Sequence, residues 1–225
     1  MRIQLNANPT ELTTGATDAL LGILALGCLW YLSHYRQIDR WKVGIWTWVL
    51  GLLTAAAILG AVVHGLALSD AMTRFLWRPL FLLLALLVAL FVVAAVYDLA
   101  GLSGARRALA TMIPLAVLFF GMTQLASGTF LVFVVYEALA MLLALGIYVS
   151  LAVRRRMRGA DLMAVAILLN IVAAGIQATG SIGFALVWQF DHNGVFHLVQ
   201  SVAVIVLMLG LRTSLLTAAY PDRST

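Results

Sequence analysis

Two histidines near the C-terminal end of the chain, His192 and His197, are the first candidates for chemistry. Residues three or four apart share one face of a helix, so Asn193, His197 and Gln200 form a polar stripe in an otherwise apolar segment. Such a stripe must face protein, because lipid offers it no hydrogen-bonding partner. His192 lies about 140° around the helix from His197 at ~100° per residue. It sits in the first turn, after the natural N-cap Asp191, where a modest distortion would bring both imidazoles to one centre.

Three further ionisable residues are expected at the same depth as these histidines. Asp18, His64 and Glu137 all lie within long apolar segments, where ionisable side chains are costly and mark function. Because neighbouring helices alternate in direction, all three fall in the same half of a helical bundle. We therefore expect them to share one cavity with the two C-terminal histidines.

Three neutral imidazoles with a nearby carboxylate are the ligand set of a catalytic zinc ion, which keeps one position open for water. We predict that His64, His192 and His197 bind the metal. Asp18 and Glu137 are the predicted catalytic carboxylates, with Glu137 as general base and Asp18 as a metal ligand or as the group that orients a histidine. No H-E-x-x-H motif supports this site, so a purely structural polar network is the alternative.

The composition indicates an integral membrane protein. Of 225 residues, 64% are hydrophobic and 10% are charged, and the mean hydropathy is +1.04, far from the average of soluble domains. The single cysteine, Cys28, excludes an internal disulfide and a Cys-based metal site. The net charge of +5 is attributed to residues that flank the spans, so no nucleic-acid partner is expected. No cleaved signal peptide is expected either.

Seven apolar segments are long enough to cross about 30 Å of hydrocarbon. The expected spans cover residues 11–34, 42–68, 73–102, 105–126, 128–153, 161–188 and 191–218. The connections are so short that consecutive helices must be antiparallel neighbours in one bundle. The predicted fold is therefore all-α, a single domain of seven transmembrane helices over residues 1–225.

Basic residues gather at one end of these spans. Eleven follow the odd-numbered spans, namely Arg36, Arg40, Lys42, Arg106, Arg107, Arg154, Arg155, Arg156, Arg158, Arg212 and Arg223, against Arg2, Arg74 and Arg78 at the other end. This bias places the N-terminus outside and the C-terminus in the cytoplasm. We therefore expect a bacterial inner-membrane protein whose site lies on the outer side. His34 and Asp98, at the cytoplasmic ends of their spans, are interpreted as boundary residues.

The arrangement resembles the seven-span superfamily of alkaline ceramidases, progestin and adipoQ receptors and the hydrolases that remodel lipid on GPI anchors. His64 matches the histidine of its second span, and D-H-N-G-V-F-H at 191–197 is similar to its D-x-H-A-L-W-H. The resemblance implies a zinc site and hydrolysis of lipid amide or ester bonds. The chain departs from the pattern at Gly60, where serine is expected, at Asn193, where histidine is expected, and in lacking an aspartate in the outer half of the third span.

The predicted function is thus zinc-dependent intramembrane hydrolysis of lipid amide or ester bonds, with membrane lipids as partners. The alternative is a non-enzymatic receptor or binding protein that holds a metal, lipid or small ligand in the same cavity. Haem ligation by His64 and His197 is less well supported, because both lie near one membrane face beside a carboxylate. A retinal Schiff base is excluded, since the only lysine, Lys42, is not on the last span. Proton-coupled transport through Glu137 and Asp18 is a further alternative, although no repeated halves are visible.

Overall fold

Local capping fixes where the first two helices begin. The side chain of Asn8 accepts a hydrogen bond from the backbone of the next turn, and proline occupies the first position of α1 (Pro9–Ser33). The side chain of Asp39 accepts a backbone hydrogen bond in the same way and caps α2 (Arg40–Gly65). Both starts agree with the expected spans to within two residues.

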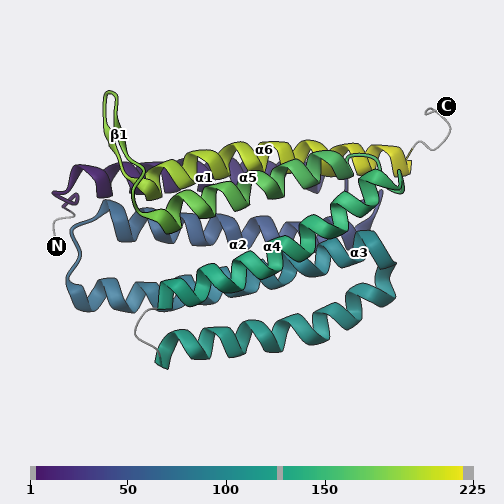
Figure 1. Cartoon of the computed structure of the whole chain (residues 1–225), viewed down its shortest axis with the longest axis horizontal. Coiled ribbons are helices and arrows are strands. Elements are labelled where there is room, and N and C mark those ends of the chain that lie inside the picture. The colour runs from purple at the N-terminus through teal and green to yellow at the C-terminus, as the bar shows by residue number, and fades with distance from the viewer. Residues whose placement is uncertain (1–3, 126–128, 220–225) are drawn as a thin grey trace.

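The computed structural model describes residues 4–125 and 129–219, with the backbone alone for residues 129–131. Within these ranges the other helices are α3 (Asp70–Leu125), α4 (Thr129–Val153), α5 (Ala160–Thr179) and α6 (His192–Ala219). All six helices are long and apolar enough to cross a membrane. They form one bundle in which α1 packs against both α2 and α6 (Figure 1). The expected all-α membrane bundle is confirmed at this level.

A single glycine divides α3. Gly101 has φ 67° and ψ −166°, so α3 consists of two helices joined across a kink. A straight helix of 56 residues would be about 84 Å long at 1.5 Å per residue, far more than the roughly 30 Å of a hydrocarbon core. The chain reverses direction at this kink (Figure 1). The third and fourth expected spans correspond to the two parts of α3.

The sixth expected span, residues 161–188, extends beyond the end of the helix in the structure. Helix α5 ends at Thr179, and Gly180 takes a left-handed conformation with φ 64°. A hairpin follows, in which β1 (Phe184–Ala185) pairs antiparallel with β2 (Gln189–Phe190). Residues 184–188 are apolar like the helix before them, and the sign of the change in the sequence is the pair of glycines at 180 and 183, with Ser181 between them. The hairpin stands out sideways from the bundle (Figure 1).

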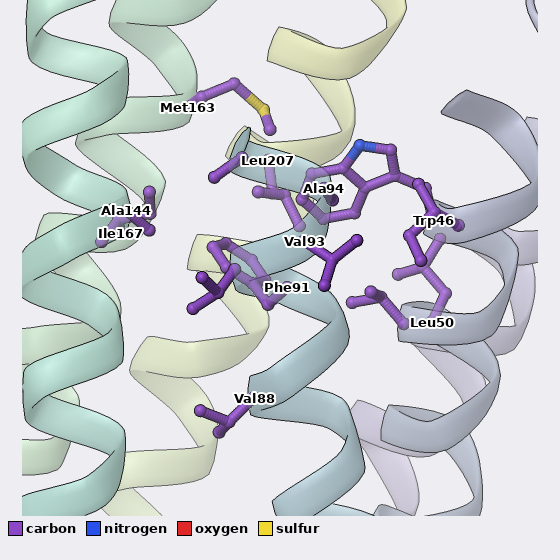
Figure 2. Packing of buried hydrophobic residues seen from close by; sticks show 14 of the residues in the cluster. Trp46, Leu50, Val88, Phe91, Val93, Ala94, Ala144, Met163, Ile167 and Leu207 are labelled. Atoms are coloured by element: carbon purple, nitrogen blue, oxygen red, sulfur yellow. The ribbon is translucent and has the colours of Figure 1, made fainter. Parts of the chain in front are cut away.

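The hydrophobic core draws side chains from all six helices. Trp46 and Leu50 of α2, Phe91 of α3, Met163 of α5 and Leu207 of α6 are all buried, and Figure 2 shows them pointing toward one another. The Trp46 ring meets the Phe91 ring edge-on, with their centroids 5.2 Å apart. Dense packing of this kind fixes the positions of the helices that carry the polar residues.

A buried ion pair fastens the end of the bundle at which α2 begins. Lys42 Nζ lies 2.6 Å from Asp98 Oδ1, and the two side chains are 6% and 3% exposed. Lys42 also donates to Ser214 Oγ at 2.7 Å, and the Tyr148 hydroxyl donates to Asp98 Oδ2 at 2.9 Å. The interpretation of Asp98 as a boundary residue is therefore wrong. His34 is exposed, as expected, and its ring lies within hydrogen-bonding distance of carbonyls of its own helix.

Candidate functional site

The five predicted site residues line one cavity. It has a volume of about 280 Å³, and all six helices contribute to its wall. The cavity lies toward the end of the bundle where α1 and α6 begin and α2 ends, which we call the site end. The predicted residues in its wall are Asp18, His64, Glu137, His192 and His197. The structure therefore brings together side chains from α1, α2, α4 and α6 that lie far apart in the sequence.

Both ring nitrogens of His197 have a neighbour. Nε2 lies 3.2 Å from Asp18 Oδ1, and Nδ1 lies 3.2 Å from Thr17 Oγ1. The Thr17 hydroxyl also lies within hydrogen-bonding distance of backbone carbonyls of the preceding turn, so the tautomer of the ring decides whether this hydroxyl donates to Nδ1 or accepts from Nδ1–H. His197 is 8% exposed, and burial favours a neutral imidazole. A neutral ring with its proton on Nε2 donates to Asp18 Oδ1. A ring with its proton on Nδ1 needs a proton or a cation between Nε2 and the carboxylate.

His64 is held through the corresponding ring atom. Its Nδ1 lies 2.7 Å from Glu11 Oε2, and its ring meets Trp77 edge-on with the centroids 5.8 Å apart. When the imidazole is neutral, the Glu11 carboxylate keeps the proton on Nδ1 and leaves Nε2 as the acceptor. In metal-binding histidines, the ring nitrogen that does not bind the metal donates its proton to an acceptor of this kind, which fixes the tautomer and the orientation of the ring. When both rings carry their proton on Nδ1, the lone pairs of His64 and His197 lie on the same atom, Nε2.

Glu137 lies in a chain of amide groups that crosses three helices. Its Oε1 accepts from Asn170 Nδ2 at 3.1 Å, and Asn170 Oδ1 accepts from Gln200 Nε2 at 3.2 Å. The Glu137 side chain is buried, with 6% of the residue exposed. The bond from Asn170 occupies one carboxylate oxygen and leaves Oε2 as the second acceptor in the cavity wall.

The first turn of α6 agrees with the expected N-cap. Asp191 Oδ1 accepts from the backbone N–H of Gly194 at 2.9 Å and from the Thr14 hydroxyl at 2.9 Å. Asn193 Oδ1 accepts from Gln177 Nε2 at 3.1 Å. These bonds tie the start of α6 to α1 and α5, which places His192 and Asn193 in the cavity wall.

The site contains a close approach between α1 and α2 at Gly60. A Cβ atom added to Gly60 would lie 2.6 Å from Asp18 Oδ2 and 2.9 Å from its Cγ, closer than real Cβ contacts. The Asp18 carboxylate therefore fills the space that a side chain at position 60 would need. This contact gives a physical reason for the glycine at a position where the resemblance predicts serine.

Two residues of the site, Glu11 and Thr17, were not among the predicted site residues. Glu11 is the first residue of the first expected span, and Thr17 directly precedes Asp18 in the sequence. A signal for Glu11 is present, because Glu11, Thr14 and Asp18 follow one another at spacings of three and four and so share one helix face. The face of α1 that carries these residues is the one turned toward the histidines.

The imidazoles and carboxylates of the cavity are suitable metal ligands by their chemistry. Their present positions do not bring three of them to one point. Within residues 4–125 and 129–219, no group of three or more His, Cys, Asp or Glu side chains is placed to share one ion. His64 and His197 nevertheless have the acceptors on Nδ1 that metal-binding histidines use. Asp18, 3.2 Å from His197 Nε2, supplies an oxygen ligand beside one of them.

Comparison with known proteins gives one match. A family model described as "Family of unknown function (DUF6962)" matches residues 13–215. No curated protein and no solved structure matches the chain. The matched residues include Asp18, His64, Glu137, His192 and His197.

Proposed function

We propose that this chain, which belongs to the family of unknown function DUF6962, is a zinc-dependent membrane hydrolase of lipid amide or ester bonds. One observation carries the proposal. Two histidines in the wall of a single cavity have Nδ1 beside an acceptor, the Glu11 carboxylate for His64 and the Thr17 hydroxyl for His197. In the tautomer with the proton on Nδ1, the lone pair on Nε2 of each ring can bind a metal. The resemblance to the ceramidase and adipoQ-receptor superfamily supports the same chemistry.

In this proposal His64, His192 and His197 hold the metal, with Asp18 as an oxygen ligand or as the partner of His197. A bound zinc ion would supply the Lewis acidity that polarises a carbonyl and activates water. Glu137 Oε2 takes the proton from the attacking water, while Asn170 holds the other carboxylate oxygen in place. The apolar part of the cavity wall, which includes Leu53, would contact the hydrocarbon part of a substrate.

The first experiment is metal analysis of purified protein. We expect wild type to bind about one zinc ion per chain, and His64→Ala and His197→Ala to retain no more than about a tenth of it. His34→Ala is the matched control, because this exposed histidine lies at the opposite end of the bundle. Equal zinc in all four proteins would contradict the metal assignment.

The proposal also includes seven membrane crossings, with each part of α3 crossing once and the N-terminus outside. The excess of basic residues at the end opposite the site supports this orientation, with the site facing outward from a bacterial inner membrane. We expect alkaline phosphatase fused after Arg156 to be inactive, and the same fusion after Ser69 to be active. Activity after Arg156 together with inactivity after Ser69 would reverse the orientation.

The second candidate function is a membrane protein that binds a lipid or small ligand without chemistry. It is favoured by the absence of a three-ligand group within the described residues. Zinc-loaded protein that cleaves no ceramide, ester or amide lipid in a broad panel would favour this candidate.

A further inference from the structure

A second hollow lies on the outside of the bundle, between the hairpin and α1. It has a volume of about 590 Å³, within the roughly 300–1,000 Å³ typical of ligand sites. Ala16 and Leu20 of α1 form one wall, and Val187 and Trp188 of the hairpin form the other. Among the residues that the structure describes, those that line the hollow carry no charge. We call it the hairpin groove.

The hairpin itself exposes a large apolar surface. Leu186, Val187 and Trp188 are 81%, 84% and 67% exposed, and residues 180–190 contain no charge. Contact of such a patch with water is unfavourable by about 25 cal/mol per Å², and patches of this kind mark sites of interaction. The strands pair with each other along their facing edges. Their outer edges need water or lipid headgroups as partners, which suits the membrane interface and not the centre of the bilayer.

The direction of the hairpin identifies what it contacts. It stands out sideways from the bundle, near the site end (Figure 1). If the helices cross the membrane, a segment in this direction lies in the plane of the bilayer at its interface, where tryptophan is enriched. The surface of α1 beside it also faces outward, since Leu20 is 50% exposed. The hairpin groove is therefore bounded by two apolar walls and is continuous with the lipid around α1.

We propose that the hairpin lies in the leaflet at the site end and that the hairpin groove binds one acyl chain of a phospholipid from that leaflet. The absence of charge in the walls suits a hydrocarbon chain and disfavours a soluble anion or a basic peptide. Thr17 lines the groove and also bonds His197. The bound chain thus lies directly behind the catalytic cavity. This assignment goes beyond the proposed hydrolase and requires neither zinc nor turnover.

The test of occupancy is native mass spectrometry of protein released from phosphatidylcholine nanodiscs. We expect wild type to retain one phosphatidylcholine molecule, and Ala16→Phe, which fills the groove, to lower that occupancy at least about tenfold. Gly27→Phe is the control, since it adds the same ring to an exposed position of the same helix where a Cβ meets nothing within 4 Å. Equal retention by Ala16→Phe and wild type would overturn the assignment. A dimer that Ala16→Phe dissociates would also overturn it, by giving the groove to a second copy of the chain.

The position of the hairpin is tested by fluorescence quenching, taking the difference between wild type and Trp188→Phe. We expect the Trp188 emission to be quenched in bilayers of phosphatidylcholine with brominated acyl chains, and to be protected from iodide in the water. The reverse pattern would place the hairpin in water and overturn the proposal. Because neither measurement depends on metal or turnover, failure of the hydrolase proposal leaves both results interpretable.

Discussion

Lys42→Met is expected to lower the free energy of unfolding by about 3–5 kcal/mol, because it leaves the buried carboxylate of Asp98 without its cation. The effect should be large here, since Asp98 is 3% exposed and lies 2.6 Å from the Lys42 ammonium. The Tyr148 hydroxyl still donates to Asp98, but one neutral donor does not replace a charge. Thermal or denaturant unfolding in detergent micelles gives the measurement.

A double variant distinguishes the loss of the ion pair from the loss of side-chain packing in Lys42→Met. Lys42→Met combined with Asp98→Leu removes both charges, and we expect it to recover most of the lost stability, since an apolar pair often replaces a buried ion pair at little cost. Arg40→Met, at an exposed position two residues earlier in the same helix, should change stability by less than about 0.5 kcal/mol. A double variant no more stable than Lys42→Met would show that the loss is one of packing.

Glu137→Gln is expected to reduce lipid turnover at least about 100-fold, the usual contribution of a general base. Glutamine keeps the size of the side chain, and its amide oxygen still accepts the hydrogen bond from Asn170. The fold and the zinc content should therefore stay unchanged while the proton acceptor is lost. Hydrolysis of a fluorescent ceramide or ester lipid, followed together with zinc content, measures both.

The other glutamate of the chain is the matched control. Glu11→Gln makes the same chemical change at the partner of His64, where we expect metal affinity to fall about 10–100-fold. Excess zinc should restore turnover in Glu11→Gln and leave Glu137→Gln inactive. Rescue of Glu137→Gln by zinc would assign Glu137 to metal binding and contradict its role as base.

The sequence predicted the helices well because long apolar runs end at strong local signals. Asp39 and Asp191 cap helices that begin beside them, and Gly101 lies where one apolar run must end and the next begin. The shared cavity was also predictable, since depth along antiparallel helices follows from residue number alone. The depth of a residue in the bundle does not determine how each helix is rotated about its own axis. This rotation decides that Glu11 contacts His64 and that Asp18 contacts His197.

The errors have two physical causes. At residues 180–190 the same apolar and aromatic side chains suit a helix and a strand, and only the left-handed turn at Gly180 separates them. At Asp98 a position near the end of an apolar run suggested access to water. Residues that follow in the chain close over it, as Tyr148 and Ser214 supply partners to the Lys42–Asp98 pair. Because these partners lie far from Asp98 in the chain, they leave no pattern in the local sequence.

The approach of α2 to α1 at Gly60 also constrains how this family can vary. Because a Cβ at position 60 would lie 2.6 Å from Asp18 Oδ2, a larger residue at position 60 requires the carboxylate at position 18 to move. A relative that carries serine at position 60 must therefore carry a smaller or redirected side chain at position 18. The two positions should covary, and each relative would place its polar group on one helix or the other. The identity of residue 60 would then tell which helix, α1 or α2, supplies the oxygen beside His197.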